Sequence, residues 1–298
     1  MLDVRDPWLR EIGRLMIPSV AGLAAVQINL FVNSWLAAGL GTGAVSWLDY
    51  AFRLMYMPIG LFGISIATAS LPTISGHAAS GDDPGMRRAV SSGLRMMLML
   101  NVPATAGLVV LATPIVRLIY EHGRFTSVDT AATAAALMCF APGLVGYSAV
   151  KLVSAVFYAM GNSRIPVFAS AASVAFNVIL NLLLVRTLGH RGLALGTAAA
   201  ALVNAALLMT LLRTRLDGVE GRRLLTATTK ICIASVAMAA AAFYSERALH
   251  APFAGEAVMT QAVRVFGAIG IAMGVLAISA HVLRIEEFTQ LRHRMLRF

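Results

Sequence analysis

Long apolar runs dominate this sequence and restrict what the chain can fold into. About 20 apolar residues in a helix cross the roughly 30 Å hydrocarbon core of a bilayer. Charged residues make up only 13% of the 298-residue chain, too few to cover a water-soluble domain of this size. The runs also lack the short alternating strands of an outer-membrane barrel. The sequence therefore predicts an all-α, polytopic membrane protein with about eight transmembrane helices, at residues 15–40, 44–74, 88–112, 127–160, 164–187, 191–213, 224–245 and 260–283.

Two of the predicted spans are longer than one straight crossing needs, and both contain helix breakers. Residues 44–74 include Pro58 and Gly60, and residues 127–160 include Pro142. A proline inside a membrane helix frees a backbone carbonyl and permits a kink where a neighbour or cavity water satisfies that group. These breakers are typical either of helices curved for packing or of helices that bend in a transporter.

Arginines are distributed unequally between the two sides of the predicted spans. Alternate loops and flanks hold 15 arginines on one side and 6 on the other, and Arg53 alone falls on neither. Because basic loops stay in the cytoplasm, the richer side and both termini are predicted to be cytoplasmic. The net charge of +10 then indicates contact with anionic lipid head groups and not with nucleic acid.

Ionisable side chains inside a membrane are costly, so each is treated as a functional candidate. Asp49 and Arg53 are four residues apart in one predicted helix, and they share a face on which they can pair. Either the pair neutralises itself as a structural element or Arg53 faces a polar cavity. Lys151 lies in the middle of a span, where it either snorkels toward the cytoplasmic end of its helix or lines a cavity.

Amide side chains provide a second polar signal within the spans. Asn29 and Asn33 share one face of the first predicted helix, and the next helix carries Arg53. We expect these two amides to line a hydrophilic cavity. A polar stripe on the fifth span is more typical of interhelical hydrogen bonding, and it consists of Ser170, Ser173, Asn177 and Asn181.

The sequence contains no catalytic constellation. It has no Walker loop and no GxSxG or HExxH motif, and its six histidines lack metal-ligand spacing. We therefore expect neither an enzyme nor a bound cofactor. Transport would draw on the membrane potential or an ion gradient and not on ATP.

Several long motifs make the sequence recognisable. The first two are PSVAGLAAVQINLFVNSWLAAGL and GAVSWLDYAFRLMYMPIGLFGISIATASLPTIS. They are followed, in order, by TPIVRLIYEHGRFTSVDT, LVSAVFYAMGNSRIPV and RGLALGTAAAALVNAALLMTLLR. With these motifs the chain resembles the MurJ/MviN lipid II flippase family of the multidrug/oligosaccharidyl-lipid/polysaccharide exporter superfamily. Members of that family flip the lipid-linked peptidoglycan precursor across the bacterial inner membrane.

The resemblance implies an architecture for each part of the chain. The family fold has two six-helix lobes around a cavity and two further helices, and this chain resembles only the last eight. Residues 15–213 would form the second transporter lobe and residues 214–283 the two additional helices. Residues 1–14 are interpreted as an interfacial segment, and residues 284–298 as a basic cytoplasmic tail. A separate first-lobe chain or self-association is expected to complete the transporter.

The resemblance also implies roles for individual residues. Arg53 matches the cationic cavity residue of the family's YADRL-like motif, and its planar fork suits the diphosphate of lipid II or a similar undecaprenyl-diphosphate-linked substrate. The motif reads YAFRL here, so that Asp49 would supply the counter-charge one turn earlier. Asn29 and Asn33 would face the sugar-peptide head group. Lys151 matches a recurring basic position without a strong family role.

The sequence thus indicates a partial, second-lobe flippase of the bacterial inner membrane. The mechanism implied by the resemblance is alternating access, in which one lobe rocks against the other. The last two helices would accommodate the isoprenoid tail of the substrate. Two alternatives stay open. One is a truncated or degenerate homologue that binds lipid or a partner without transport, and the other is an exporter of another lipid-linked glycan or a drug.

Overall fold

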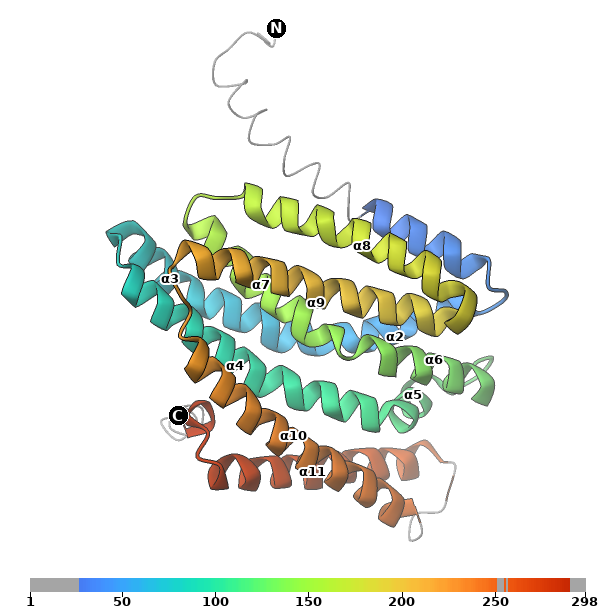
Figure 1. Ribbon diagram of the computed structural model, residues 1–298. Helices are drawn as coiled ribbons and strands as arrows, with labels where there is room; N and C mark the ends of the chain where they lie inside the picture. The colour runs from blue at the N-terminus through green and yellow to red at the C-terminus, as the bar shows by residue number, and fades with distance from the viewer. Residues whose placement is uncertain (1–26, 251–254, 256, 290–298) are drawn as a thin grey trace, which may run out of the picture.

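The described part of the protein consists of helices joined by short loops. The computed structural model describes residues 27–250, 255 and 257–289 (Figure 1). A helical stretch at 27–38 comes first. It is followed by α2 (Ala44–Pro58), the π-helix η1 (Ile59–Ile64), α3 (Ser65–Ser80), α4 (Asp83–Val110), α5 (Ala112–Tyr120), α6 (Ser127–Phe140), α7 (Gly143–Ala159), α8 (Arg164–Leu188), α9 (His190–Arg215), α10 (Gly221–His250) and α11 (Val258–Val282). The all-helical prediction is confirmed.

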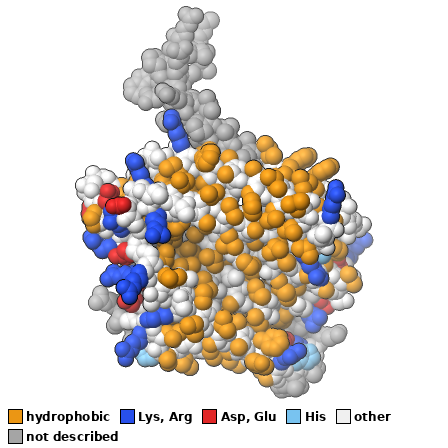
Figure 2. Space-filling model, viewed as in Figure 1, with side chains coloured by type: hydrophobic (Ala, Val, Ile, Leu, Met, Phe, Trp, Pro, Cys, Tyr) orange, Lys and Arg blue, Asp and Glu red, His pale blue; other side chains and the backbone are white. Residues whose placement is uncertain are grey.

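Most of the predicted membrane spans are present as helices. Within the described ranges, six helices are long and apolar enough to cross a membrane, and α6 with α7 would add a seventh as one bent crossing. They match the predicted spans from 44–74 onward. The first predicted span, 15–40, is described only from residue 27, and the segments 1–14 and 290–298 lie outside the described residues. Figure 2 shows hydrophobic side chains over the middle of one face and Lys and Arg toward its two ends, as a membrane-spanning bundle requires.

Both predicted breakers alter helix geometry. The run Ala44–Ser80 stays continuous, but directly after Pro58 it widens into the π-helix η1. Such turns are one way in which a helix accommodates a break in its hydrogen-bond ladder. At Pro142 the chain bends by 45° between α6 and α7. Thr105 of α4 donates its hydroxyl to the Ala141 carbonyl there, at 3.3 Å. A neighbouring helix thus adds a second hydrogen bond to a carbonyl at the kink, which also accepts from the Leu144 N–H at 3.1 Å.

Three clusters of buried hydrophobic side chains hold the bundle together. One includes Phe157 of α7, and a second includes Met55 of α2 and Leu144 of α7. The third joins α10 and α11 to Met99 of α4. The last two helices therefore pack on one side of the bundle, against α4 and α5 (Figure 1). The domain division predicted at residues 213 and 214 falls close to the loop between α9 and α10, and it stays a prediction.

A side-chain cap fixes the turn between α3 and α4. Asp82 Oδ1 accepts a hydrogen bond from the Gly85 N–H at 2.9 Å, and Asp82 Oδ2 lies 2.9 Å from His77 Nδ1. The hydrogen bond from Gly85 is the main cause that holds the pKa of Asp82 below its ordinary value. Arg87 and Arg88 follow in the first turns of α4, so that this cap positions part of the arginine-rich end of the bundle.

Candidate substrate-binding site

Arg53 and Asp49 form an ion pair on α2, as their spacing predicts. Arg53 Nη2 lies 2.9 Å from Asp49 Oδ2, and the two side chains are 67% and 53% exposed. Leu54 and Met55 of the same helix are buried in the bundle. The pair therefore lies on the outward face of α2, within the candidate span Ala44–Ser80.

Phe52 occupies the position where the family motif has an acid, and it packs against the bundle. Its ring meets Phe140 of α6 edge-on, with 5.6 Å between ring centroids, and Tyr147 of α7 at 6.1 Å. The aromatic side chain thus joins α2 to both halves of the bent span. An acid at this position would face apolar rings, whereas Asp49 reaches Arg53 from one turn away.

Asn29 and Asn33, the two amides of the first predicted span, have different surroundings. Asn33 Oδ1 accepts a hydrogen bond from Asn181 Nδ2 of α8 at 2.6 Å, and the same Nδ2 lies 3.1 Å from Asn177 Oδ1. Asn29 Oδ1 is buried, and it has no hydrogen-bond partner among the described residues. Within residues 27–250, 255 and 257–289, no hydrogen bond or ion pair joins either amide to Arg53. The cavity role predicted for Asn29 and Asn33 stays a prediction.

The polar stripe on α8 takes part in helix packing, which was the favoured interpretation. Ser173 donates its hydroxyl to the Ala200 carbonyl of α9 at 2.8 Å. Asn181 is fully buried, and its side chain lies so close to Gly196 of α9 that a Cβ at this glycine would overlap with it. Small residues on α9 therefore let the polar side chains of α8 approach closely, as in other membrane helix pairs.

Lys151 lies on the exposed side of α7, and the next two residues, Leu152 and Val153, are fully buried. In the part of the chain that the structure describes, its ammonium group has no hydrogen bond or ion pair. Snorkelling and a cavity role both remain predictions for this residue.

Two largely buried ion pairs involve arginines that the sequence reasoning assigned to loops. Arg95 Nε of α4 lies 2.7 Å from Glu287 Oε1, and their side chains are 10% and 4% exposed. Arg264 of α11 bonds Glu246 of α10 at 2.6 Å. Arg95 and Arg264 lie farther inside the predicted spans than arginines at span ends such as Arg88, Arg164 and Arg191, and this depth is the sequence signal that could have found them.

Together these features define a class of protein. A bundle of membrane-spanning helices with broken spans, an intramembrane ion pair and buried amides is typical of a secondary transporter. Among solved structures, lipid II flippase MurJ in an inward closed conformation gives a TM-score of 0.72 at 24% identity, covering 92% of this chain and 56% of that one. A multidrug resistance MATE family transporter of the MOP superfamily, in an outward-facing conformation, gives 0.57 at 15% identity, covering 94% and 66%. The fold is that of these membrane transporters.

Sequence comparison identifies the family. A family model described as lipid II flippase MurJ matches residues 1–263. The probable lipid II flippase MurJ of Vibrio cholerae serotype O1 is 35% identical over 237 residues, covering 80% of this chain and 44% of the relative. The corresponding protein of Rhizobium meliloti is 32% identical over 270 residues, covering 90% and 50%. The chain belongs to the lipid II flippase MurJ family, and it spans about half the length of the curated relatives it matches.

Proposed function

We propose that this chain forms one lobe of a flippase for lipid II, or for a similar undecaprenyl-diphosphate-linked precursor, in the bacterial inner membrane. Family membership over most of the chain supports the substrate class, and the part of each relative that this chain matches, about half, has the size expected of one lobe with its additional helices. A first-lobe chain, or a second copy of this chain, completes the cavity. Both termini are cytoplasmic in this proposal, in agreement with the arginine distribution.

The observation that carries the proposal is the exposed ion pair on α2. Arg53 lies nine residues beyond Ala44, or about 14 Å along the helix, which places it well inside the span. A central arginine that faces lipid costs about 2.5–3.5 kcal/mol on insertion scales. Because Arg53 and Asp49 are more than half exposed in this chain, their face needs a polar neighbour such as a cavity and the opposing lobe.

The chemistry of this face suits a diphosphate. An arginine presents two parallel N–H donors to phosphate oxygens, whereas a lysine acts as a point charge. Asp49 neutralises and orients Arg53 while the site is empty. In the proposal, Asn29 and Asn33 face the sugar-peptide head group, and α10 and α11 accommodate the lipid tail. The membrane potential or an ion gradient supplies the driving force.

Complementation of a flippase-depleted strain tests this role. The chain is expressed with a first lobe, and its abundance in the membrane is measured in parallel. Arg53→Ala should abolish growth, Arg53→Lys should weaken it because the fork is lost, and Asp49→Asn should be milder. The matched control is Arg186→Ala, at an exposed arginine of α8, which should grow normally.

Two results would contradict the proposal. Normal growth with Arg53→Ala at normal abundance would remove this arginine from the site. Reduced abundance of both Arg53→Ala and Asp49→Asn would instead identify a structural pair, because each change leaves one charge without its partner.

The competing hypothesis is a homologue that binds lipid or a partner without transport, and the observation that favours it is that Arg53 and Asp49 already pair with each other at 2.9 Å. The oligomeric state distinguishes the two. A strictly monomeric chain in nanodiscs at all concentrations, with no complementation beside any first lobe, would favour this second role. An exporter of another lipid-linked glycan or a drug would assemble with a first lobe but would not rescue the depleted strain.

A further inference from the structure

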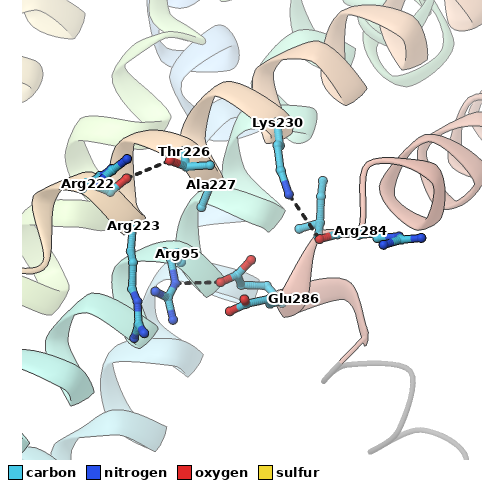
Figure 3. Close-up of a pocket in the computed structure, with 10 residues that line it drawn as sticks. Arg95, Arg222, Arg223, Thr226, Ala227, Lys230, Arg284 and Glu286 are labelled. Atoms are coloured by element: carbon cyan, nitrogen blue, oxygen red, sulfur yellow. Dashed lines mark hydrogen bonds and ion pairs between the residues drawn. The ribbon is translucent and has the colours of Figure 1, made fainter.

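A cavity of about 260 Å³ lies at the arginine-rich end of the bundle (Figure 3). It is formed by α4, by the first turns of α10 and by the segment that follows α11. It is separate in the fold from the ion pair on α2. Half of the ten residues that line it are cationic, namely Arg95, Arg222, Arg223, Lys230 and Arg284.

Ion pairs within the chain neutralise only some of these cations. Arg95 is paired with the buried Glu287 at 2.7 Å, and both residues line the cavity. Arg223 lies 3.4 Å from Glu220, but its side chain is 70% exposed, so that this contact is weak. Among the residues that the structure describes, the other cationic side chains of the cavity have no carboxylate partner.

Arg222 and Lys230 lie two turns apart on α10, and neither has an acidic partner in the described chain. Lys230 points toward the segment after α11, where its Nζ meets the backbone carbonyl of Arg284 at 3.5 Å (Figure 3). That carbonyl is a neutral acceptor, and the distance is at the limit of a hydrogen bond. The guanidinium of Arg284 points away from Lys230 in the same view. With Glu286 as the remaining acid, the cavity keeps a net positive charge.

Membrane-spanning helices border this cationic cavity. Besides Arg95 of α4, its lining residues lie at the start of α10 and directly after the end of α11. Both helices are candidate membrane spans. A ligand bound here would therefore meet positive charge at the ends of two helices that are apolar enough to cross a membrane. An amphiphile with an anionic head group and apolar chains matches both the positive charge and the apolar helices. A free ion matches only the positive charge.

We propose that this cavity binds the phosphate group of an anionic phospholipid. Basic pockets between membrane helices on the cytoplasmic side hold phospholipid head groups in this way. Phosphate oxygens accept hydrogen bonds from guanidinium and ammonium groups such as those of Arg222 and Lys230. The acyl chains lie along α10 and α11. The bound lipid joins α10 to the segment after α11, which the Arg95–Glu287 pair holds in place.

Native mass spectrometry of the full chain in zwitterionic detergent tests the proposal. The probes are phosphatidylglycerol, phosphatidylcholine and inorganic phosphate. The chain should retain phosphatidylglycerol in preference to phosphatidylcholine. Each basic side chain near an anionic lipid contributes about fivefold in affinity, so Arg222→Gln with Lys230→Gln should lower retention by roughly 25-fold. The matched control is Arg213→Gln with Arg215→Gln, at exposed arginines of α9 outside the cavity.

Each other outcome overturns the proposal. Equal loss in the control pair would show that general charge, and not the cavity, attracts the lipid. Equal retention of the two phospholipids would exclude recognition of the anionic head group. Binding of inorganic phosphate without phosphatidylglycerol would identify a site for a soluble phosphate. The thermal midpoint of each variant without lipid must match that of the parent chain, which separates lost binding from lost folding.

Discussion

The buried ion pair between Arg95 and Glu287 connects α4 to the segment after α11, and its removal gives a quantitative prediction. Arg95 Nε and Glu287 Oε1 are 2.7 Å apart, and the side chains are 10% and 4% exposed. Little water therefore reaches either partner. Glu287→Gln leaves the arginine charge buried and unpaired, and Arg95→Met does the same to the carboxylate.

The expected magnitudes follow from this burial. Removing one partner of a buried pair costs about 3–5 kcal/mol of stability, whereas replacing both by apolar side chains of similar volume is close to neutral. Each single variant should therefore unfold much more easily than the parent. Arg95→Met combined with Glu287→Met should recover most of the loss, which gives a coupling energy of about 3 kcal/mol or more in a double-mutant cycle.

Reversible unfolding of the full chain in mixed micelles with increasing sodium dodecyl sulfate measures these free energies. The control is Arg223→Gln, because Arg223 and Glu220 form an exposed pair at 3.4 Å, and loss of such a pair costs at most about 1 kcal/mol. If Glu287→Gln unfolds like this control, or if the double variant loses the sum of both single effects, the reasoning from burial is wrong.

Two further predictions concern topology and packing. Cys139→Ala and Cys232→Ala first remove the two native cysteines. In that background, a thiol reagent should label Arg124→Cys only from outside the cell and Thr214→Cys only from the cytoplasm. The reverse labelling pattern would contradict the topology predicted from the arginine count. Gly146→Ala should destabilise the contact of α7 with α9 by about 1–3 kcal/mol, because a Cβ at Gly146 would lie 2.7 Å from the backbone of Ala201. Gly76→Ala, which meets open space, should be neutral or slightly stabilising in the same unfolding assay, and equal losses would contradict the packing argument.

The membrane spans and their breaks could be predicted because the sequence encodes them locally. A run of apolar residues signals a span whatever lies next to it. The bend at Pro142 and the π-helix after Pro58 both fall at prolines, which lack the N–H of a regular helix. Proline alone does not decide the break, because α3 and α4 continue past Pro72 and Pro103. The pairing of Asp49 with Arg53 is local as well, because four residues make one helical turn.

The partners of polar side chains across helices could not be predicted in the same way. Helical periodicity placed Asn29 and Asn33 on one face, but it did not determine which helix that face would meet. The structure sets Asn33 against Asn181 of α8, a contact between residues that are 148 positions apart in the sequence. Such a contact depends on tertiary packing, which the periodicity of one helix does not determine.

The two buried ion pairs also constrain how this chain can move. Glu246 and Arg264 join α10 to α11 at one end of that helix pair, and Arg95 and Glu287 join α4 to the segment after α11. Together with the apolar cluster that α4, α10 and α11 share, these contacts attach the last two helices firmly to the rest of the bundle. Sliding α10 and α11 past α4 would break a buried charge pair at a cost of about 3–5 kcal/mol. Alternating access by the proposed flippase would therefore require the lobe and its two additional helices to rock together, and the outward face of α2 would be the surface that opens and closes.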